Sequence, residues 1–327
     1  MRRPLIPLVL ALSVAVALAG CSGKSTASAS HTPTPSATST GPMVPVDWTG
    51  STVPTVTGSY GDKPAITFPT SKAPTQLERK ILTQGSGPAV GKDDLLVADY
   101  YGVVWGAKTA FDNSYDRGQP VGFTIGVGKV IQGWDDTLVG MKAGTRVLIS
   151  LPPTEGYGSA GNTSAGIKGT DTLVFVVDIV SSYSGAAVAD AHAKVQPAVA
   201  GLPTITGALA TQPTIKIPAK LAKPTKQSTR LLAKGSGPVV GKELVIVQYQ
   251  VVDWTGAAVA STWTDKSPAG VNVGQTGSTG VFDGLIGLPI GSRVLIELPV
   301  SQGQGPYAAV VDIVAVAQSA KLTAAGG

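Results

Sequence analysis

The pattern of hydrophobic and polar positions predicts a chain built mainly from β-strands. Runs rich in β-branched and aromatic residues, bounded by Gly, Pro and Asp, lie at 95–105, 145–151 and 172–180. Short runs of this composition between turn formers are typical of strands. In one other segment the apolar residues follow the 3-4-3 spacing of a helix face: Ile131, Trp134, Leu138 and Met141. A sheet wrapped over one short helix is an α+β architecture.

The pattern occurs twice along the chain. Three pairs of segments carry the repeat: 85–92 (GSGPAVGK) and 235–242 (GSGPVVGK), 144–149 (GTRVLI) and 291–296 (GSRVLI), and 175–180 (FVVDIV) and 309–314 (AVVDIV). Their order is preserved, while their separation falls from 150 to 147 and then to 134 residues. Ordered self-similarity of this kind indicates a tandem duplication. The second copy therefore lacks 13 residues (147 − 134) between the last two segments.

The duplication sets the expected domain organisation. We expect a first domain over 44–184, which includes an N-terminal strand extension, and a degenerate second domain over 202–318. An Ala/Val-rich linker over 185–201 joins them, and 319–327 form a C-terminal tail. Each domain is expected to be an antiparallel sheet over a short helix, with the helix weak or lost in the second copy.

The N-terminus has the pattern of an export signal. A basic start, Met1-Arg2-Arg3, precedes an apolar stretch over 5–18, which is shorter than the ~20 residues of a membrane-spanning helix. The stretch ends in Leu-Ala-Gly-Cys21, which resembles a bacterial lipobox, where the cysteine receives a diacylglyceryl group and becomes the first residue after cleavage. We expect residues 1–20 to be a lipoprotein signal peptide and 21–43 a disordered Ser/Thr/Pro tether. The alternative is an ordinary signal peptide with an incidental cysteine.

A lipidated Cys21 predicts a protein held on the extracytoplasmic face of the cell membrane, because two acyl chains suffice for stable anchoring. Residues 191–242 carry eight basic and no acidic residues. This stretch is interpreted either as attraction to an anionic membrane surface or wall polymer, or as a solvated face. No nucleic-acid partner is expected, because the chain is predicted to be exported and shows no interleaving of basic and aromatic residues.

The rare residue types narrow the chemistry. The chain has 2 His and 1 Cys, so neither a four-ligand Cys/His zinc site nor a disulfide framework can be assembled. Any Ser-His-Asp triad would have to use one of those two histidines. The sequence predicts neither a metal nor a cofactor.

Five motifs of the first copy occur together in one order: VADYYG at 97–102, FD at 111–112 followed by Arg117, VIQGW at 130–134, GYG at 156–158 and TLVF at 172–175. Their order and spacing resemble the FKBP family of macrolide-binding peptidyl-prolyl cis/trans isomerases. The resemblance covers roughly 77–180. Taken singly, each aromatic residue in these motifs is more often plain core, and only the joint pattern points to a site.

The resemblance implies a hydrophobic pocket for a proline ring. The implied catalytic residues are Tyr100, Asp112, Trp134 and Tyr157. The implied substrate-binding residues are Phe111, Arg117, Val121, Phe123, Val130, Ile131, Ile167 and Phe175. By this resemblance Trp134 would form the floor and Ile167 would cap the pocket, while the Ile131 N–H and the Tyr157 hydroxyl would donate to substrate carbonyls. Asp112 would lie by the rotating amide, held by Tyr100 or Arg117. Val121 departs from the family, which has phenylalanine there.

The second copy does not keep this set. Tyr249 is retained, but the Phe-Asp positions become about Ala260-Ser261. The pocket tryptophan becomes Val281 or Phe282, depending on a one-residue gap, and the Tyr157 position becomes Gln304. The second copy is therefore predicted to be a non-catalytic domain.

Two functions remain open at this point. The first is an exported, lipid-anchored prolyl isomerase that assists the folding of secreted proteins, with its activity in the first domain. Its partners would be proline-containing unfolded or secreted polypeptides, and macrolide inhibitors would be further ligands. The reaction breaks no bond, so it does not need histidine. The alternative is a chaperone or binding lipoprotein with weak or no catalysis.

Overall fold

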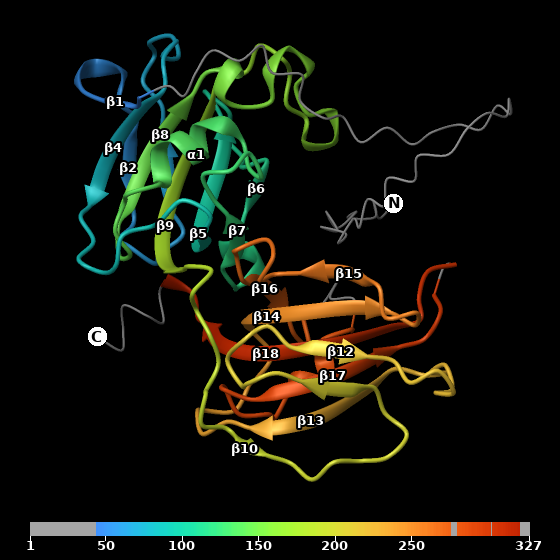
Figure 1. Cartoon of the computed structure of the whole chain (residues 1–327). Helices are drawn as coiled ribbons and strands as arrows, with labels where there is room; N and C mark the ends of the chain where they lie inside the picture. Colours follow the sequence, from blue (N-terminus) through green and yellow to red (C-terminus); the bar gives the residue numbers. More distant parts are fainter. Residues whose placement is uncertain (1–43, 276–279, 302, 321–327) are drawn as a thin grey trace, which may run out of the picture.

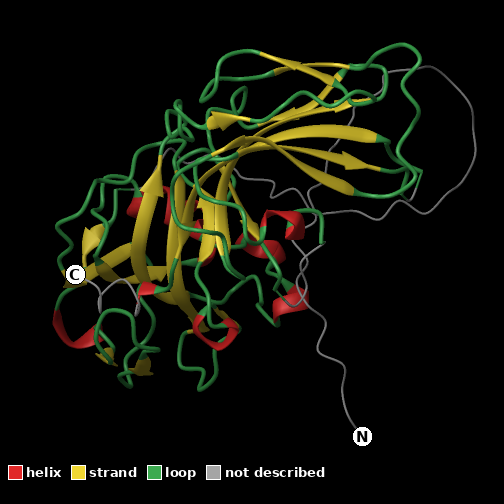
Figure 2. Cartoon of the chain, turned by 90° about the horizontal axis from the view of Figure 1, so that it is seen from below, coloured by secondary structure: helices red, strands yellow, loops and turns green. Residues whose placement is uncertain are grey.

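The computed structural model describes residues 44–275, 280–301 and 303–320, which form two β-rich domains (Figure 1). The expected signal peptide, Cys21 and the tether all lie outside these residues. Strands dominate, and the helical segments are short (Figure 2). Among the described helices, none has the length and hydrophobicity needed to cross a bilayer.

The first domain is a 7-stranded sheet in the order β1-β4-β8-β9-β5-β6, with β7 paired to β5. Its strands are β1 (Val46–Asp47), β4 (Glu78–Thr83), β5 (Leu95–Val104), β6 (Asp112–Asn113), β7 (Val121–Thr124), β8 (Arg146–Leu151) and β9 (Leu173–Tyr183). Only β1 and β4 run parallel among the described pairs of this sheet. One α-helix, α1 (Gln132–Leu138), contributes Trp134 and Leu138 to the core against the sheet. The α+β architecture predicted for this copy is confirmed.

Short 3-10 helices complete the connections of the first domain: η1 (Gly50–Thr52), η2 (Tyr115–Arg117), η3 (Pro153–Glu155), η4 (Gly158–Ala160) and η5 (Thr163–Ala165). The last three lie in the long loop between β8 and β9.

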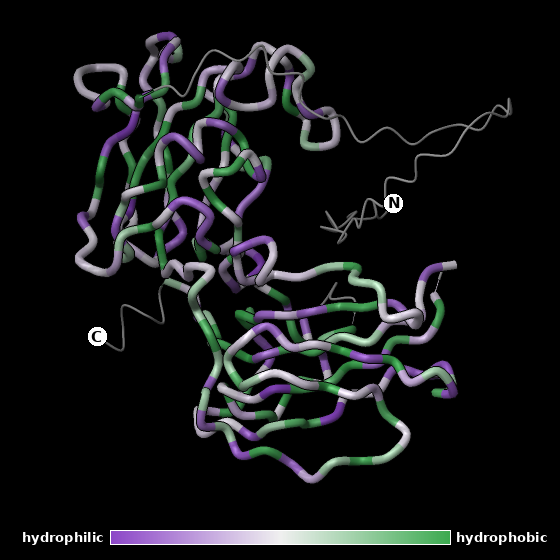
Figure 3. The backbone as a smooth tube through the Cα atoms, in the orientation of Figure 1, coloured by the Kyte–Doolittle hydropathy of each residue, from purple (hydrophilic) through white to green (hydrophobic). Residues whose placement is uncertain are grey.

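The central strands are apolar on both faces because both faces are covered. Hydrophobic stretches run along the middle of each sheet (Figure 3). On β5, Leu96, Ala98 and Tyr100 belong to the core beneath α1. Leu95 and Val97 point the other way, into a cluster shared with the second domain. A strand covered on both faces loses the alternation of a half-exposed strand, which explains the continuous apolar run in the sequence.

The second domain is a 7-stranded sheet with the corresponding order β10-β13-β17-β18-β14-β15, and β16 pairs with β14. Its strands are β10 (Lys194–Val195), β13 (Ser228–Lys234), β14 (Leu244–Asp253), β15 (Ala258–Ser261), β16 (Ala269–Asn272), β17 (Arg293–Leu298) and β18 (Tyr307–Ala317). A single 3-10 turn, η6 (Asp283–Leu285), stands where the first domain has α1.

Two predicted boundaries need correction. The expected linker over 185–201 contains β10, which pairs antiparallel with β13 and so belongs to the second sheet. The expected tail over 319–327 does not begin as a free end. Ala320 is 0% exposed, and its N–H donates to Asp99 Oδ2 of the first domain at 2.7 Å. Neither contact could be recognised from composition, because both depend on how distant segments pack.

Each domain carries a hairpin fastened by a buried ion pair. The hairpins are β2 (Thr55–Thr57) with β3 (Ala65–Thr67), and β11 (Thr204–Thr206) with β12 (Thr214–Lys216). In the first domain, Arg146 Nε contacts Asp178 Oδ1 at 2.6 Å, and the guanidinium also donates to the carbonyls of Gly58 and Asp62. Arg293 and Asp312 repeat this arrangement in the second domain, with the carbonyls of Ala208 and Thr211.

The glycines that open the repeated GSGP motif have a steric reason. A Cβ on Gly85 would lie 2.3 Å from the Ala143 carbonyl oxygen, and a Cβ on Gly235 would lie 2.3 Å from that of Ile290. Each glycine lets the segment that follows β4 or β13 pass directly over the turn that precedes β8 or β17. The strongest repeat in the sequence therefore marks framework positions, not site positions.

Candidate active site

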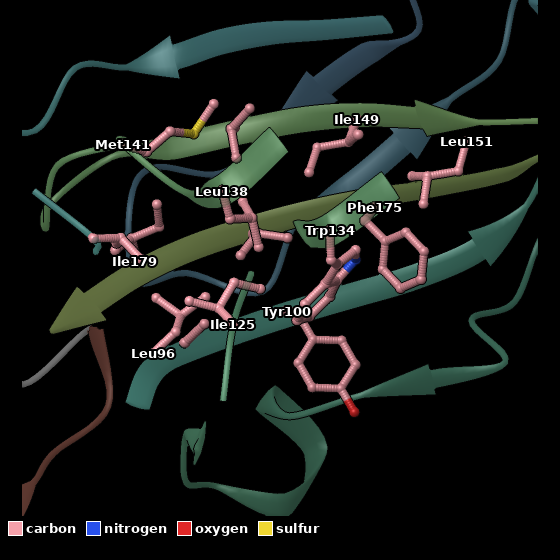
Figure 4. Close-up of a cluster of buried hydrophobic side chains, with 14 of the residues drawn as sticks. Leu96, Tyr100, Ile125, Trp134, Leu138, Met141, Ile149, Leu151, Phe175 and Ile179 are labelled. Atoms are coloured by element: carbon pink, nitrogen blue, oxygen red, sulfur yellow. The ribbon is translucent and has the colours of Figure 1, made fainter. Parts of the chain in front are cut away.

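The centre of the candidate site is an aromatic cup around Trp134. The ring of Trp134 meets Tyr100, Phe123 and Phe175 at centroid distances of 5.5, 5.0 and 5.3 Å. All three contacts are edge to face, which is a favourable geometry for aromatic pairs. Tyr100, Trp134 and Phe175 come from β5, α1 and β9 and converge in Figure 4. With β7, which carries Phe123, four elements that are distant in sequence therefore build one aromatic cluster.

The helix that carries Trp134 is fixed by Asp135. Its two carboxylate oxygens accept hydrogen bonds from the N–H groups of Gly126 and Gly128, each at 2.6 Å. Burial raises the pKa of Asp135, and these two backbone donors oppose that rise. Because the contacts tie α1 to the loop after β7, they hold the indole against the rings from β5 and β9.

A glycine on β5 makes room for the far wall. A Cβ on Gly102 would lie 2.7 Å from both Phe111 Cζ and Phe175 Cε1. The rings of Phe111 and Phe175 meet above it at 5.6 Å, nearly perpendicular. Any side chain at 102 would therefore displace one of these two rings.

The polar part of the site is a three-residue set at the rim. The Tyr100 hydroxyl donates to Asp112 Oδ2, and Arg117 Nη1 donates to Asp112 Oδ1 at 2.5 Å. Arg117 Nη2 also donates to the Tyr100 hydroxyl oxygen at 2.9 Å. The sequence left open whether Tyr100 or Arg117 holds Asp112, and the structure shows that both do. The Asp112 side chain is 33% exposed, so a charged carboxylate lies at the edge of an apolar cup.

The remaining predicted residues surround the cup. Six are half-buried against the core cluster: Phe111, Val121, Phe123, Val130, Ile131 and Tyr157. Ile167 is 3% exposed and belongs to the same cluster. Ile131 directly precedes α1, and its carbonyl accepts from the Trp134 N–H at 3.0 Å. The structure thus brings all the predicted pocket residues of the first copy to one region.

Two features of the site were not identified from the sequence. Ser114 is 0% exposed, and its hydroxyl joins β5 to the segment that carries Asp112 and Arg117. Trp134 Nε1 is buried and has no hydrogen-bond partner among the described residues. The indole therefore keeps a buried N–H donor that is unpaired among the described residues. The VIQGW motif gave the position of this indole but no indication that its N–H would be unpaired.

The hydroxyls of the site stay protonated over a wide pH range. Burial, and secondly the hydrogen bond to Asp112, raises the pKa of Tyr100 above its usual value. Burial also raises the pKa of Tyr157, against an opposing hydrogen bond from Asn162. An ordinary tyrosine titrates near ~10, so both groups remain neutral donors well above neutrality.

We expect catalysis to be independent of pH from about pH 6 to about pH 9, because the raised tyrosine pKa values lie above this range. The described histidine, His192, is exposed in the segment that joins the domains. Measuring kcat/KM by NMR exchange across this range tests the expectation. A bell-shaped profile centred near neutrality would indicate acid–base chemistry and contradict it.

The corresponding region of the second domain lacks the cup. In the first sheet Asp112 pairs with Gly102, two residues after Tyr100. In the second sheet Ala260 pairs with Val251, two residues after Tyr249. The pairing therefore places the Asp112 equivalent at Ala260, which corrects by one residue the alignment with Ala260-Ser261.

Phe282 takes the place of Trp134, because its neighbour Asp283 accepts from the Gly274 N–H as Asp135 does from the Gly126 N–H. The loop between the last two strands shrinks from residues 152–172 to 299–306, and Gln304 lies exposed in a tight turn with Ser301. The second framework therefore has phenylalanine at the Trp134 position and alanine at the Asp112 position.

Comparison with known proteins agrees with this geometry. A family described as FKBP-type peptidyl-prolyl cis-trans isomerase matches residues 87–180. The FK506-binding protein of Streptomyces anulatus is 36% identical over 120 residues, which cover 37% of this chain and 97% of that protein. FK506-binding protein 1A of Neurospora crassa is 37% identical over 107 residues, covering 32% and 86%. FK506-binding protein 1 of Debaryomyces hansenii is 38% identical over 110 residues, covering 33% and 96%. The chain therefore belongs to the family of FKBP-type peptidyl-prolyl cis-trans isomerases.

Proposed function

We propose that the first domain isomerises X–Pro bonds in unfolded or secreted polypeptides, and that the protein acts outside the cell membrane, anchored by lipid at Cys21. The observation that carries the catalytic part is the Trp134 cup with Asp112 fixed at its rim. A proline ring matches the apolar cup in chemistry, and the flanking peptide would lie along the rim.

The energetics of the reaction suit such a site. Rotation about a peptide bond has a barrier of about 18–20 kcal/mol. A rate of roughly 10² s⁻¹ corresponds to a barrier near 15 kcal/mol, so the site supplies only about 5 kcal/mol. A twisted amide has lost its resonance and is less polar at its carbonyl than a planar one. An apolar cup therefore favours the twisted form over the planar ground state.

The polar groups have a positioning part in this proposal. Hydrogen bonds from the Tyr157 hydroxyl and the Ile131 N–H would hold the carbonyls beside the proline. Asp112 would lie near the twisting amide, and its contacts with Tyr100 and Arg117 fix it before substrate arrives. Prearranged groups of this kind need no reorganisation as the transition state forms.

The test is direct. The full-length protein should accelerate cis/trans exchange of a proline-containing tetrapeptide, and FK506 should inhibit it, since relatives of this chain are named FK506-binding proteins. NMR exchange measures the rate without a coupled protease. Peptide binding with no acceleration would instead favour a chaperone or binding function.

The anchoring part rests on the sequence Leu-Ala-Gly-Cys21 after an apolar stretch. Cys21→Ala should release the protein from the membrane or retain it with an uncleaved signal, because no thiol remains to accept the lipid. Partitioning into Triton X-114 after expression in the native host is the measurement, with Ser22→Ala as the matched control. Detergent partitioning and signal cleavage of the Cys21 variant both equal to those of wild type would contradict the proposal.

A further inference from the structure

The two domains share a hydrophobic interface. Residues from both contribute to one buried cluster: Leu95, Val97 and Val180 from the first domain, and Leu244, Ile246, Ala317 and Ala320 from the second. β7 lies against β16, and a Cβ on Gly122 would lie 3.5 Å from the Gly270 Cα (Figure 1). The face of β5 opposite the aromatic cup is thus packed on the second domain. β5 therefore contacts the second domain with one face and the candidate site with the other.

At this interface each domain holds the segment that follows the other domain's last strand. Asp99 precedes Tyr100, and Gln248 precedes Tyr249, so the two residues occupy equivalent places in β5 and β14. Asp99 Oδ2 accepts from the N–H of Ala320, just after β18. Gln248 Nε2 donates to the carbonyls of Gly185 and Ala187, just after β9, at 3.2 and 3.0 Å. The exchange is reciprocal, but only the first domain uses a carboxylate.

The Asp99 carboxylate leads directly into the site. Its other oxygen, Oδ1, accepts from the Ser114 hydroxyl at 2.7 Å. The Ser114 oxygen in turn accepts from the Tyr100 N–H at 3.0 Å. A serine hydroxyl has one proton to donate. Because Ser114 donates it in the hydrogen bond to Asp99, the Ser114 oxygen serves as the acceptor for the Tyr100 N–H. Ala320, Asp99, Ser114 and Tyr100 thus form one chain of hydrogen bonds, and both side chains in it are buried.

Ser114 also fixes the rim residues. Its N–H donates to the Tyr100 carbonyl at 3.0 Å, and its own carbonyl accepts from the Arg117 N–H at 3.0 Å. Asp112 lies two residues before it. The orientation of Ser114 therefore sets how the segment that carries Asp112 and Arg117 lies on β5.

The second domain shows the arrangement without the carboxylate. Thr262 Oγ1 accepts from the Tyr249 N–H at 2.8 Å, and it turns its own proton to the Tyr249 carbonyl at 3.4 Å. The hydroxyl there bonds only within its own strand pair. The connection to the other domain through a charged group is thus peculiar to the domain with the aromatic cup.

We propose that Asp99 is a positioning residue through which the second domain, by the Ala320 N–H, aligns Ser114 and with it Tyr100, Asp112 and Arg117. This gives the degenerate domain a role in the activity of the first. The proposal rests on the proposed isomerase function. It assigns the second domain no substrate of its own.

The test compares Ala320→Pro with Ala320→Gly in the full-length protein. Proline removes the N–H that Asp99 accepts, whereas glycine keeps it. We expect Ala320→Pro to lower kcat by about three- to tenfold at unchanged KM, because small misplacements of positioned groups lower the rate without emptying the cup. Ala320→Gly should stay within about twofold of wild type. Equal kcat values for the two variants would overturn the proposal.

A double-mutant cycle separates positioning from mere stability. In an Asp99→Asn background, Ala320→Pro should cost no further activity, because both changes break the same chain. Fully additive losses would overturn the coupling. Asp99→Asn alone should lower kcat and shift the backbone amide resonance of Tyr100, and an unchanged kcat and resonance would overturn it even if Ala320→Pro did not fold.

The amide resonance also separates this proposal from the isomerase function. If wild type showed no acceleration, the isomerase function would fail, while the Tyr100 resonance would still report the coupling. If wild type were active and neither kcat nor the resonance responded to Ala320→Pro, the coupling alone would fail.

Discussion

Trp134→Ala in the full-length protein is expected to lower kcat/KM by roughly 10- to 100-fold, or about 1.4–2.7 kcal/mol of transition-state stabilisation. The indole contacts three rings and is 4% exposed, so its removal takes away the floor and leaves Tyr100, Phe123 and Phe175 without their common neighbour. Since the site has to supply only about 5 kcal/mol in total, this is a large share. NMR exchange on a proline peptide, well below the unfolding temperature, measures the loss.

The matched control is Phe282→Ala, the same change at the equivalent position of the second domain. It removes a ring from a region where Ala260 stands in place of the acidic residue, so kcat/KM should stay within about twofold of wild type. Equal losses in the two variants would contradict the assignment of activity to the first domain.

The framework was predictable because the residues that recur between the copies build it. The repeated RVLI and VVDIV segments supply both arginines and both aspartates of the buried ion pairs, so they recur together. Helix α1 was predictable from the spacing of Trp134 and Leu138, which both belong to the core. Its bounds are narrower than the apolar pattern suggested, because Met141 packs from the turn that follows it.

The candidate site was recognisable only as a joint pattern, and its supporting contacts were not. Asp99 and Ala320 are 221 residues apart, and their contact exists only because the two sheets pack together. No local periodicity reports such a contact. The one-residue error at Ala260 has another origin: the chain from Val251 to its partner Ala260 is one residue shorter than the chain from Gly102 to its partner Asp112. The position of such a deletion leaves no trace in composition.

The predicted linker illustrates the same limit. An Ala/Val-rich segment with few charges was interpreted as a connection, but its carbonyls at Gly185 and Ala187 bind Gln248, and part of it pairs as β10. Composition indicates how much apolar surface a segment can bury. It does not indicate which residues the segment will contact, because those contacts depend on how the two domains pack.

Arg146→Ala is expected to lower the free energy of unfolding by about 3–5 kcal/mol, the usual cost of breaking a buried ion pair by removing one partner. The Arg146 side chain is 1% exposed and that of Asp178 0%, so the variant leaves a carboxylate in the interior without its counter-ion. Asp178 would retain donors from the Gly61 N–H and the Tyr115 hydroxyl, whereas the carbonyls of Gly58 and Asp62 would lose theirs.

Lys63→Ala is the control for Arg146→Ala. Its ammonium lies 2.6 Å from Asp116, the same separation as in the buried pair, but the two side chains are 48% and 60% exposed. Water screens such a pair, so the loss should be at most about 1 kcal/mol. Urea unfolding followed by circular dichroism measures both variants. Equal losses in the two variants would contradict this expectation. They would show that burial of the Arg146–Asp178 pair adds nothing to what an exposed ion pair contributes to stability.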